Sequence, residues 1–150
     1  MNPLQLTNEQ MEQLTSEIAV GRLKTVPIDL VKTQMFMEKA SEAIGEFANI
    51  SSVGVLYDTA YTVCHDIGEA TMAAYGYKPA PIDGHHAVLG EFLTILFSNS
   101  PARIAVTNFD DLRKSRNSRM YSAKPIGKSL AELAMETAKE LFSEAKTQLN

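Results

Sequence analysis

The chain has 150 residues, with 14 Lys and Arg against 18 Asp and Glu, a formal net charge of −4 and a single cysteine. Its length predicts one domain, 1–150, and the absence of a long apolar run or a leader-like start argues against a membrane-spanning or secreted protein and favours the cytoplasm. The negative charge argues against nonspecific coating of DNA. Cys64 cannot form an internal disulfide, and its apolar neighbours predict a buried, unreactive thiol.

Apolar residues recur at helical spacing through most of the chain, in segments separated by proline and glycine. The first predicted helix opens with Thr7 and Gln10 at the spacing of a capping box and ends near Lys24. The second follows Asp29, a suitable N-cap residue, and ends near Phe47.

The third predicted helix covers about 52–75, and the glycines and prolines of 76–84 predict a loop after it. A fourth helix ends before Ser98, a fifth spans about 102–121, and a sixth is capped by Ser129. No segment has the alternation typical of a strand. Because the apolar stripes must be buried against each other and the connections are short, we predict an all-α, up-down bundle of five to six helices.

The segment from 112 to 128 is locally basic, although the whole chain is acidic. Its ionised residues are Arg113, Lys114, Arg116, Arg119, Lys124 and Lys128. Such a patch favours a phosphate-bearing partner, but cations are also common at the ends of solvated helices.

Arg116 is the most informative residue of the fifth helix. At 100° per residue it falls in line with Phe109 and Leu112, so it lies within the apolar stripe, where a guanidinium needs a partner. Two interpretations stay open. Arg116 pairs with a carboxylate of the third helix, such as Asp58 or Glu69, or it binds a phosphate.

Three polar residues border that stripe at successive spacings of four: Arg113, Asn117 and Tyr121. On a helix such residues form one ridge. Two donors and a phenol beside Arg116 would suit a phosphate group.

The run Leu112-Arg-Lys-Ser-Arg-Asn-Ser-Arg-Met-Tyr121 resembles the signature of the HEPN family, an Arg followed by a polar residue and then a His after four to six positions. The upstream segments Tyr57-Asp-Thr-Ala, Gly76-Tyr-Lys-Pro and Gly84-His-His-Ala-Val-Leu resemble a branch of the same family. The resemblance extends from about Val53 to Tyr121. It implies an HEPN-like helical bundle.

This resemblance implies a metal-independent endoribonuclease, often a toxin or antiphage effector of a toxin–antitoxin pair, that acts as a homodimer with the two motifs facing each other. Arg116 takes the phosphate role and Asn117 the polar position, while Tyr121 occupies the place of the family's His. An unperturbed tyrosine titrates near pH 10, too high for a general base. Either Tyr121 acts as a donor, or His85 or His86 supplies the base.

We assign Arg116, Tyr121, Asn117 and His86 as expected catalytic residues. The expected RNA- or phosphate-binding residues are Arg113, Arg119 and His85. The alternative is a noncatalytic HEPN-like module that binds RNA, a nucleotide or a protein, working beside a partner such as a nucleotidyltransferase-like antitoxin.

A second alternative is a metal site. His65 and Glu69 stand at i, i+4 on one helix face, and His85 with His86 would complete a set suited to zinc or iron. The repeated Glu-x-x-His pairs typical of helical-bundle metalloproteins do not occur, so we expect no cofactor.

Overall fold

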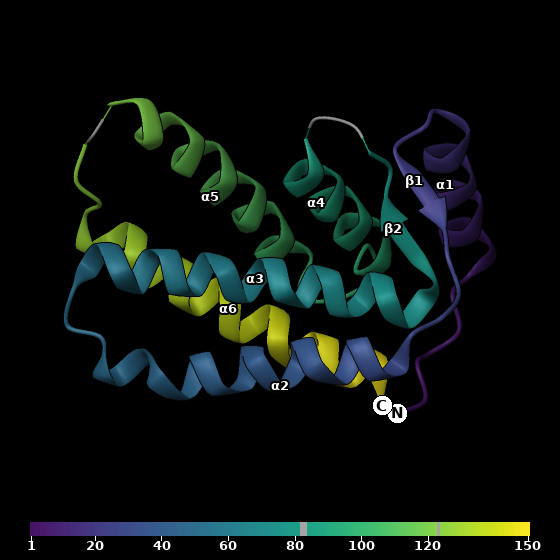
Figure 1. The fold of residues 1–150 in the computed structure, drawn as a ribbon, viewed down its shortest axis with the longest axis horizontal. Helices are drawn as coiled ribbons and strands as arrows, with labels where there is room; N and C mark the ends of the chain where they lie inside the picture. Colours follow the sequence, from purple (N-terminus) through teal and green to yellow (C-terminus); the bar gives the residue numbers. More distant parts are fainter. Residues whose placement is uncertain (82–83, 123) are drawn as a thin grey trace.

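The computed structural model describes residues 1–81, 84–122 and 124–150, without the side chains of 119–122. In these residues the chain is an all-α bundle with six α-helices, as predicted, and a small two-stranded sheet (Figure 1). The elements in chain order are α1 (Asn8–Ala19), β1 (Leu23–Thr25), α2 (Leu30–Glu46), a 3-10 turn η1 (Phe47–Asn49), α3 (Val53–Tyr75), β2 (Tyr77–Pro79), α4 (His85–Leu96), α5 (Arg103–Ser122) and α6 (Lys128–Leu149).

The longest helix, α3, lies at the centre of the bundle and contacts α2, α4, α5 and α6 (Figure 1). Small residues let its neighbours approach closely. A Cβ added to Gly68 would lie 3.1 Å from Cδ2 of Leu89, so α4 packs directly on this part of α3. Cys64 is fully buried, as predicted, and burial raises the pKa of its thiol.

The helix starts follow local chemistry in three cases and not in a fourth. Thr7 and Gln10 form the predicted capping box, Asp29 caps α2 by accepting from the amide of Lys32, and Ser52 caps α3. The predicted cap of the last helix is wrong: α6 begins one residue before Ser129, and its N-cap position is Gly127, which supplies no side-chain bond.

Two strands contradict the expectation that no strand forms and that 76–84 is wholly a loop. β1 and β2 pair antiparallel, with Lys24 opposite Lys78. The first helix ends at Ala19 rather than near Lys24, because Gly21 turns the chain with a φ of 80° before β1 begins. Strands of three residues are too short for their alternation to be visible in a sequence.

The way α5 packs on α3 places Arg116. Phe109 and Leu112 are fully buried, and the hydroxyl of Tyr57 in α3 donates to the carbonyl oxygen of Leu112 at 2.7 Å. Arg116 follows Leu112 by one turn on the same line of α5 and is half-buried. Among the residues described, no helix is long and apolar enough to cross a membrane.

Candidate functional site

Six polar side chains from α3, α4 and α5 lie together, and these residues are called the polar cluster below. Its α3 members are separated by four residues each and therefore share one face of that helix. The start of α4 and the second half of α5 supply the others. The members are Tyr61, His65, Glu69, His85, His86 and Arg116, which include all three histidines of the chain.

Arg116 has an aromatic partner rather than an acidic one. Its guanidinium carbon lies 4.9 Å from the centre of the Tyr61 ring. Within the described part of the chain it has no carboxylate within 4.0 Å, so the interpretation that it pairs with Asp58 or Glu69 is wrong. Glu69 contacts Lys32 and His85 instead. A cation held on an aromatic face keeps its charge and its donors available to an anion.

Tyr61 connects Arg116 to the histidines. Its hydroxyl lies 2.8 Å from Nδ1 of His86, and its ring packs 5.5 Å from the ring of Phe109. Burial raises the pKa of Tyr61 to about 12, although Arg116 and Arg113 oppose that change. The phenol is therefore protonated at neutral pH and can donate to His86.

His86 is neutral at pH 7. Burial lowers its pKa to about 4, and the nearby His65, Arg116, His85 and Arg113 add to the effect. Two tautomers fit the contact with the phenol. If Nδ1 accepts a hydrogen bond from the phenol, Nε2 carries the imidazole proton and is a donor; if Nδ1–H donates to the phenolic oxygen, Nε2 is a free base.

The rings of the other two histidines also lie near that of His86. The ring of His65 is 4.5 Å from that of His86 and 5.8 Å from that of His85. Nε2 of His85 lies 2.8 Å from a carboxylate oxygen of Glu69. Burial lowers the pKa of His65, with a smaller opposing effect from Glu69. One ligand atom from each of His65, Glu69 and His85 lies within 4.8 Å of the other two, so these residues could hold a metal ion.

Comparison of the chain with models of known protein families, with curated proteins and with solved structures gives no match. Function is therefore inferred from the chemistry of the residues themselves.

The expected site residues fall into three groups. Arg116, His85 and His86 lie together in the polar cluster. Arg113 is half-buried nearby, but its guanidinium donates two hydrogen bonds to Asp110, at 2.9 and 3.1 Å. Asn117 is exposed. The side chains of Arg119 and Tyr121 lie outside the described residues, so the ridge predicted from Arg113 to Tyr121 is described only in part.

Two members of the cluster were not among the expected catalytic or phosphate-binding residues. These are Tyr61, which no motif in the sequence singles out, and His65, which is expected only as a metal ligand. The signal was present in the spacing of Tyr61, His65 and Glu69, since residues four apart on a helix share a face. The sequence did not indicate that this face meets Arg116.

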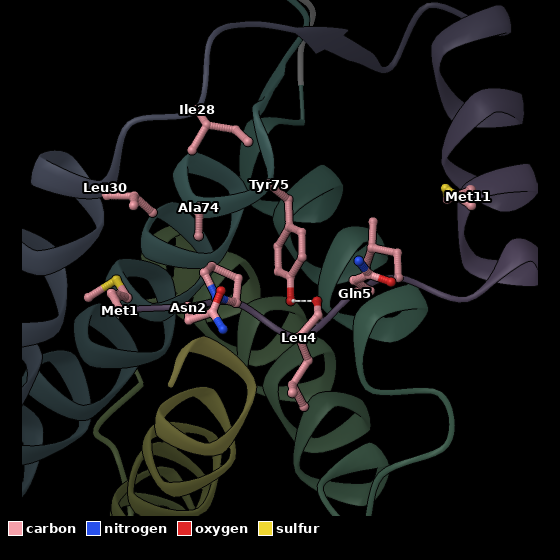
Figure 2. A pocket seen from close by; sticks show the side chains of 11 residues that line it. Met1, Asn2, Leu4, Gln5, Met11, Ile28, Leu30, Ala74 and Tyr75 are labelled. Atoms are coloured by element: carbon pink, nitrogen blue, oxygen red, sulfur yellow. Dashed lines mark hydrogen bonds between the residues drawn. The ribbon is translucent and has the colours of Figure 1, made fainter.

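A separate hollow of about 480 Å³ is lined by residues near the N-terminus (Figure 2). The two chain termini lie next to each other at this end of the bundle (Figure 1). The walls of the hollow are mainly apolar, with Leu4, Ile28 and Leu30 around Tyr75, whose hydroxyl donates to the carbonyl oxygen of Leu4 at 2.8 Å. Tyr75 follows Tyr61 by 14 residues on α3, a rise of about 21 Å. This hollow is thus distant from the polar cluster.

Proposed function

We propose that the chain binds RNA at Arg116 and cleaves it without a metal ion, as a cytoplasmic ribonuclease of the HEPN type. The observation that carries the proposal is the half-buried guanidinium of Arg116, which rests on the Tyr61 ring without a carboxylate partner among the described residues. A phosphate would supply the missing negative charge.

The shape of the group and the charge around it favour a phosphodiester. A guanidinium offers a planar fork of donors that matches two phosphate oxygens. The two ionised residues that precede Arg116 most closely in α5, Arg113 and Lys114, are also basic. Arg113 is close enough to lower the pKa of His86, so it adds to the positive potential at the site.

The cleavage step that fits these groups is attack by the ribose 2′-hydroxyl on the adjacent phosphorus. The 2′-oxygen forms a bond to phosphorus, the bond from phosphorus to the 5′-oxygen breaks, and the products carry a 2′,3′-cyclic phosphate and a 5′-hydroxyl. His86 is neutral at pH 7. In the tautomer whose imidazole proton is on Nδ1, its Nε2 is free to take the proton of the 2′-hydroxyl. Tyr121 remains the expected donor to the departing 5′-oxygen.

A second candidate is a noncatalytic module that binds RNA or a nucleotide. The contact between Tyr61 and His86 favours it, because a protonated phenol beside the cationic Arg116 finds its acceptor in Nδ1. The proton of His86 then lies on Nε2, which donates to a phosphate and cannot accept from a hydroxyl. In that case a partner, such as a nucleotidyltransferase-like protein, would supply the chemistry.

We further propose that the chain is a homodimer in which two Arg116 sites face each other. Nine of the twelve large apolar residues that are exposed in the described chain precede residue 36, among them Val20, Val31 and Met35. Those residues do not surround Arg116. In a dimer with facing sites, the interface is therefore formed by the more polar surface of α5 and not by these apolar residues. Light scattering combined with size-exclusion chromatography tests whether the chain forms this dimer.

The deciding experiment uses labelled single-stranded RNA in EDTA, with Arg116→Ala compared with Arg103→Ala. Arg103 is an exposed arginine of the same helix, so the two variants lose the same charge. We expect Arg116→Ala to reduce cleavage by about a hundredfold or more, and Arg103→Ala to have little effect. Products should carry 2′,3′-cyclic phosphate ends.

Three results separate the candidates. If the wild type binds RNA in an Arg116-dependent way without cutting it, the noncatalytic candidate is correct. Cleavage that needs a divalent ion contradicts the mechanism. Equal activity in Arg116→Ala and Arg103→Ala contradicts the site.

A further inference from the structure

Beside the proposed RNA site, α3 and the start of α4 bring together three side chains of the kind that bind transition metals. His65 and Glu69 come from one face of α3, and His85 is the first residue of α4. In the described residues this is the one group of three or more such side chains whose ligand atoms lie within 4.8 Å of one another. We propose that His65, Glu69 and His85 form a binding site for one Zn²⁺ ion.

The distances require only side-chain adjustment. Tetrahedral zinc bound at about 2.0–2.1 Å holds its ligand atoms about 3.3 Å apart. Nε2 of His85 and Oε1 of Glu69 are already 2.8 Å apart, and the ligand atom of His65 lies within 4.8 Å of both. A shift of at most about 1.5 Å in the His65 ring would close the site.

The donor set favours zinc over harder ions. Two imidazole nitrogens and one carboxylate oxygen match the three protein ligands of open zinc sites, and magnesium or calcium would prefer oxygen alone. The fourth position is left for water, and His86 stays outside the ligand set with its ring 4.5 Å from that of His65. When zinc binds, the hydrogen bond between His85 and Glu69 is replaced by two bonds to the metal.

A cation in direct contact with one of the three ligands opposes the ion. Nζ of Lys32 lies 3.5 Å from Oε2 of Glu69, the oxygen that does not contact His85. The Lys32 side chain is 47% exposed, so it can withdraw into solvent when a cation binds. Because Lys32 competes with a cation for Glu69, removing the charge of Lys32 should strengthen zinc binding.

The ion would join the second half of α3 to the start of α4. His86 follows His85 directly and contacts Tyr61, which in turn holds Arg116. Zinc would therefore restrict the histidine nearest the proposed RNA site without taking part in the cleavage step. The zinc site does not depend on the proposed function, and each can fail without the other.

The test is calorimetric titration of Zn²⁺ into the full chain after treatment with EDTA and dialysis. We expect one ion per chain with micromolar or tighter affinity, and Co²⁺ in its place should give the intense visible absorption of a tetrahedral site. His65→Ala, Glu69→Gln and His85→Ala should each weaken binding at least about tenfold, Lys32→Met should strengthen it, and the distant Glu12→Gln should not change it.

Circular dichroism of each variant confirms that the helices persist. Absence of zinc binding up to 100 μM, or binding that survives His65→Ala and His85→Ala, would overturn the site. RNA binding that depends on Arg116 in a chain that takes up no zinc would overturn the metal site alone. Zinc binding in a chain that ignores RNA would overturn the proposed function alone.

Discussion

Replacing Tyr61 tests whether its ring holds Arg116 in place for a phosphate. Tyr61→Phe removes the hydroxyl that contacts His86 and keeps the ring under the guanidinium. Tyr61→Leu removes both. If the ring is what matters for Arg116, the two variants should differ in RNA affinity even though both lose the hydrogen bond.

The expected magnitudes follow from the contacts. Loss of the hydrogen bond should lower the free energy of unfolding by about 1 kcal/mol in either variant. The leucine variant also loses the contact of the ring with the cation, worth about 0.5–2 kcal/mol, and the packing of the ring on Phe109, worth about 0.5–1.5 kcal/mol. Arg116 then has to be ordered by the ligand, which costs about 1 kcal/mol and weakens RNA binding about fivefold.

The assay is fluorescence anisotropy of labelled single-stranded RNA at fixed salt, combined with urea denaturation of each variant. A double-mutant cycle between Tyr61→Leu and Arg116→Ala should give a coupling of about 1 kcal/mol in RNA binding. The cycle with Tyr61→Phe should give a coupling close to zero. Equal losses of RNA affinity in the phenylalanine and leucine variants would refute the reasoning.

Three further predictions concern stability. Gly76→Ala should lower the free energy of unfolding by more than about 2 kcal/mol, because φ is 76° and the new Cβ would lie 2.7 Å from a carbonyl oxygen; Gly45→Ala, in an open helical position, should instead stabilise by about 0.5–1 kcal/mol in urea denaturation. Tyr57→Phe should cost about 1–2 kcal/mol in the same assay, through the lost bond to Leu112. Burial, and to a smaller extent the neighbouring carboxylate of Glu91, raises the pKa of Glu17, so the ionised form of Glu17 opposes folding at pH 7. Glu17→Gln should therefore raise the melting temperature at pH 7. The gain should vanish below pH 4.5, where Glu17 is protonated in both the folded and the unfolded chain.

The sequence by itself determined the helices, because apolar spacing and local capping act over a few residues. The capping box at Thr7 and the cap at Asp29 were predicted and are present. The burial of Phe109 and Leu112 was predicted from one face of one helix. The strands around Lys24 and Lys78 were missed, because each consists of three residues and exists only through its pairing with the other.

The tertiary structure decided the surroundings of Arg116. Helical spacing indicated that its side chain lies within an apolar stripe, but α3 has several faces, and the carboxylates Asp58 and Glu69 were plausible partners. The packing of α5 on α3 placed Tyr61 there instead. The packing of α4 on α3 near Gly68 brought the three histidines together. Spacing along one helix determines which residues share a face, whereas contacts between helices distant in sequence determine what that face meets.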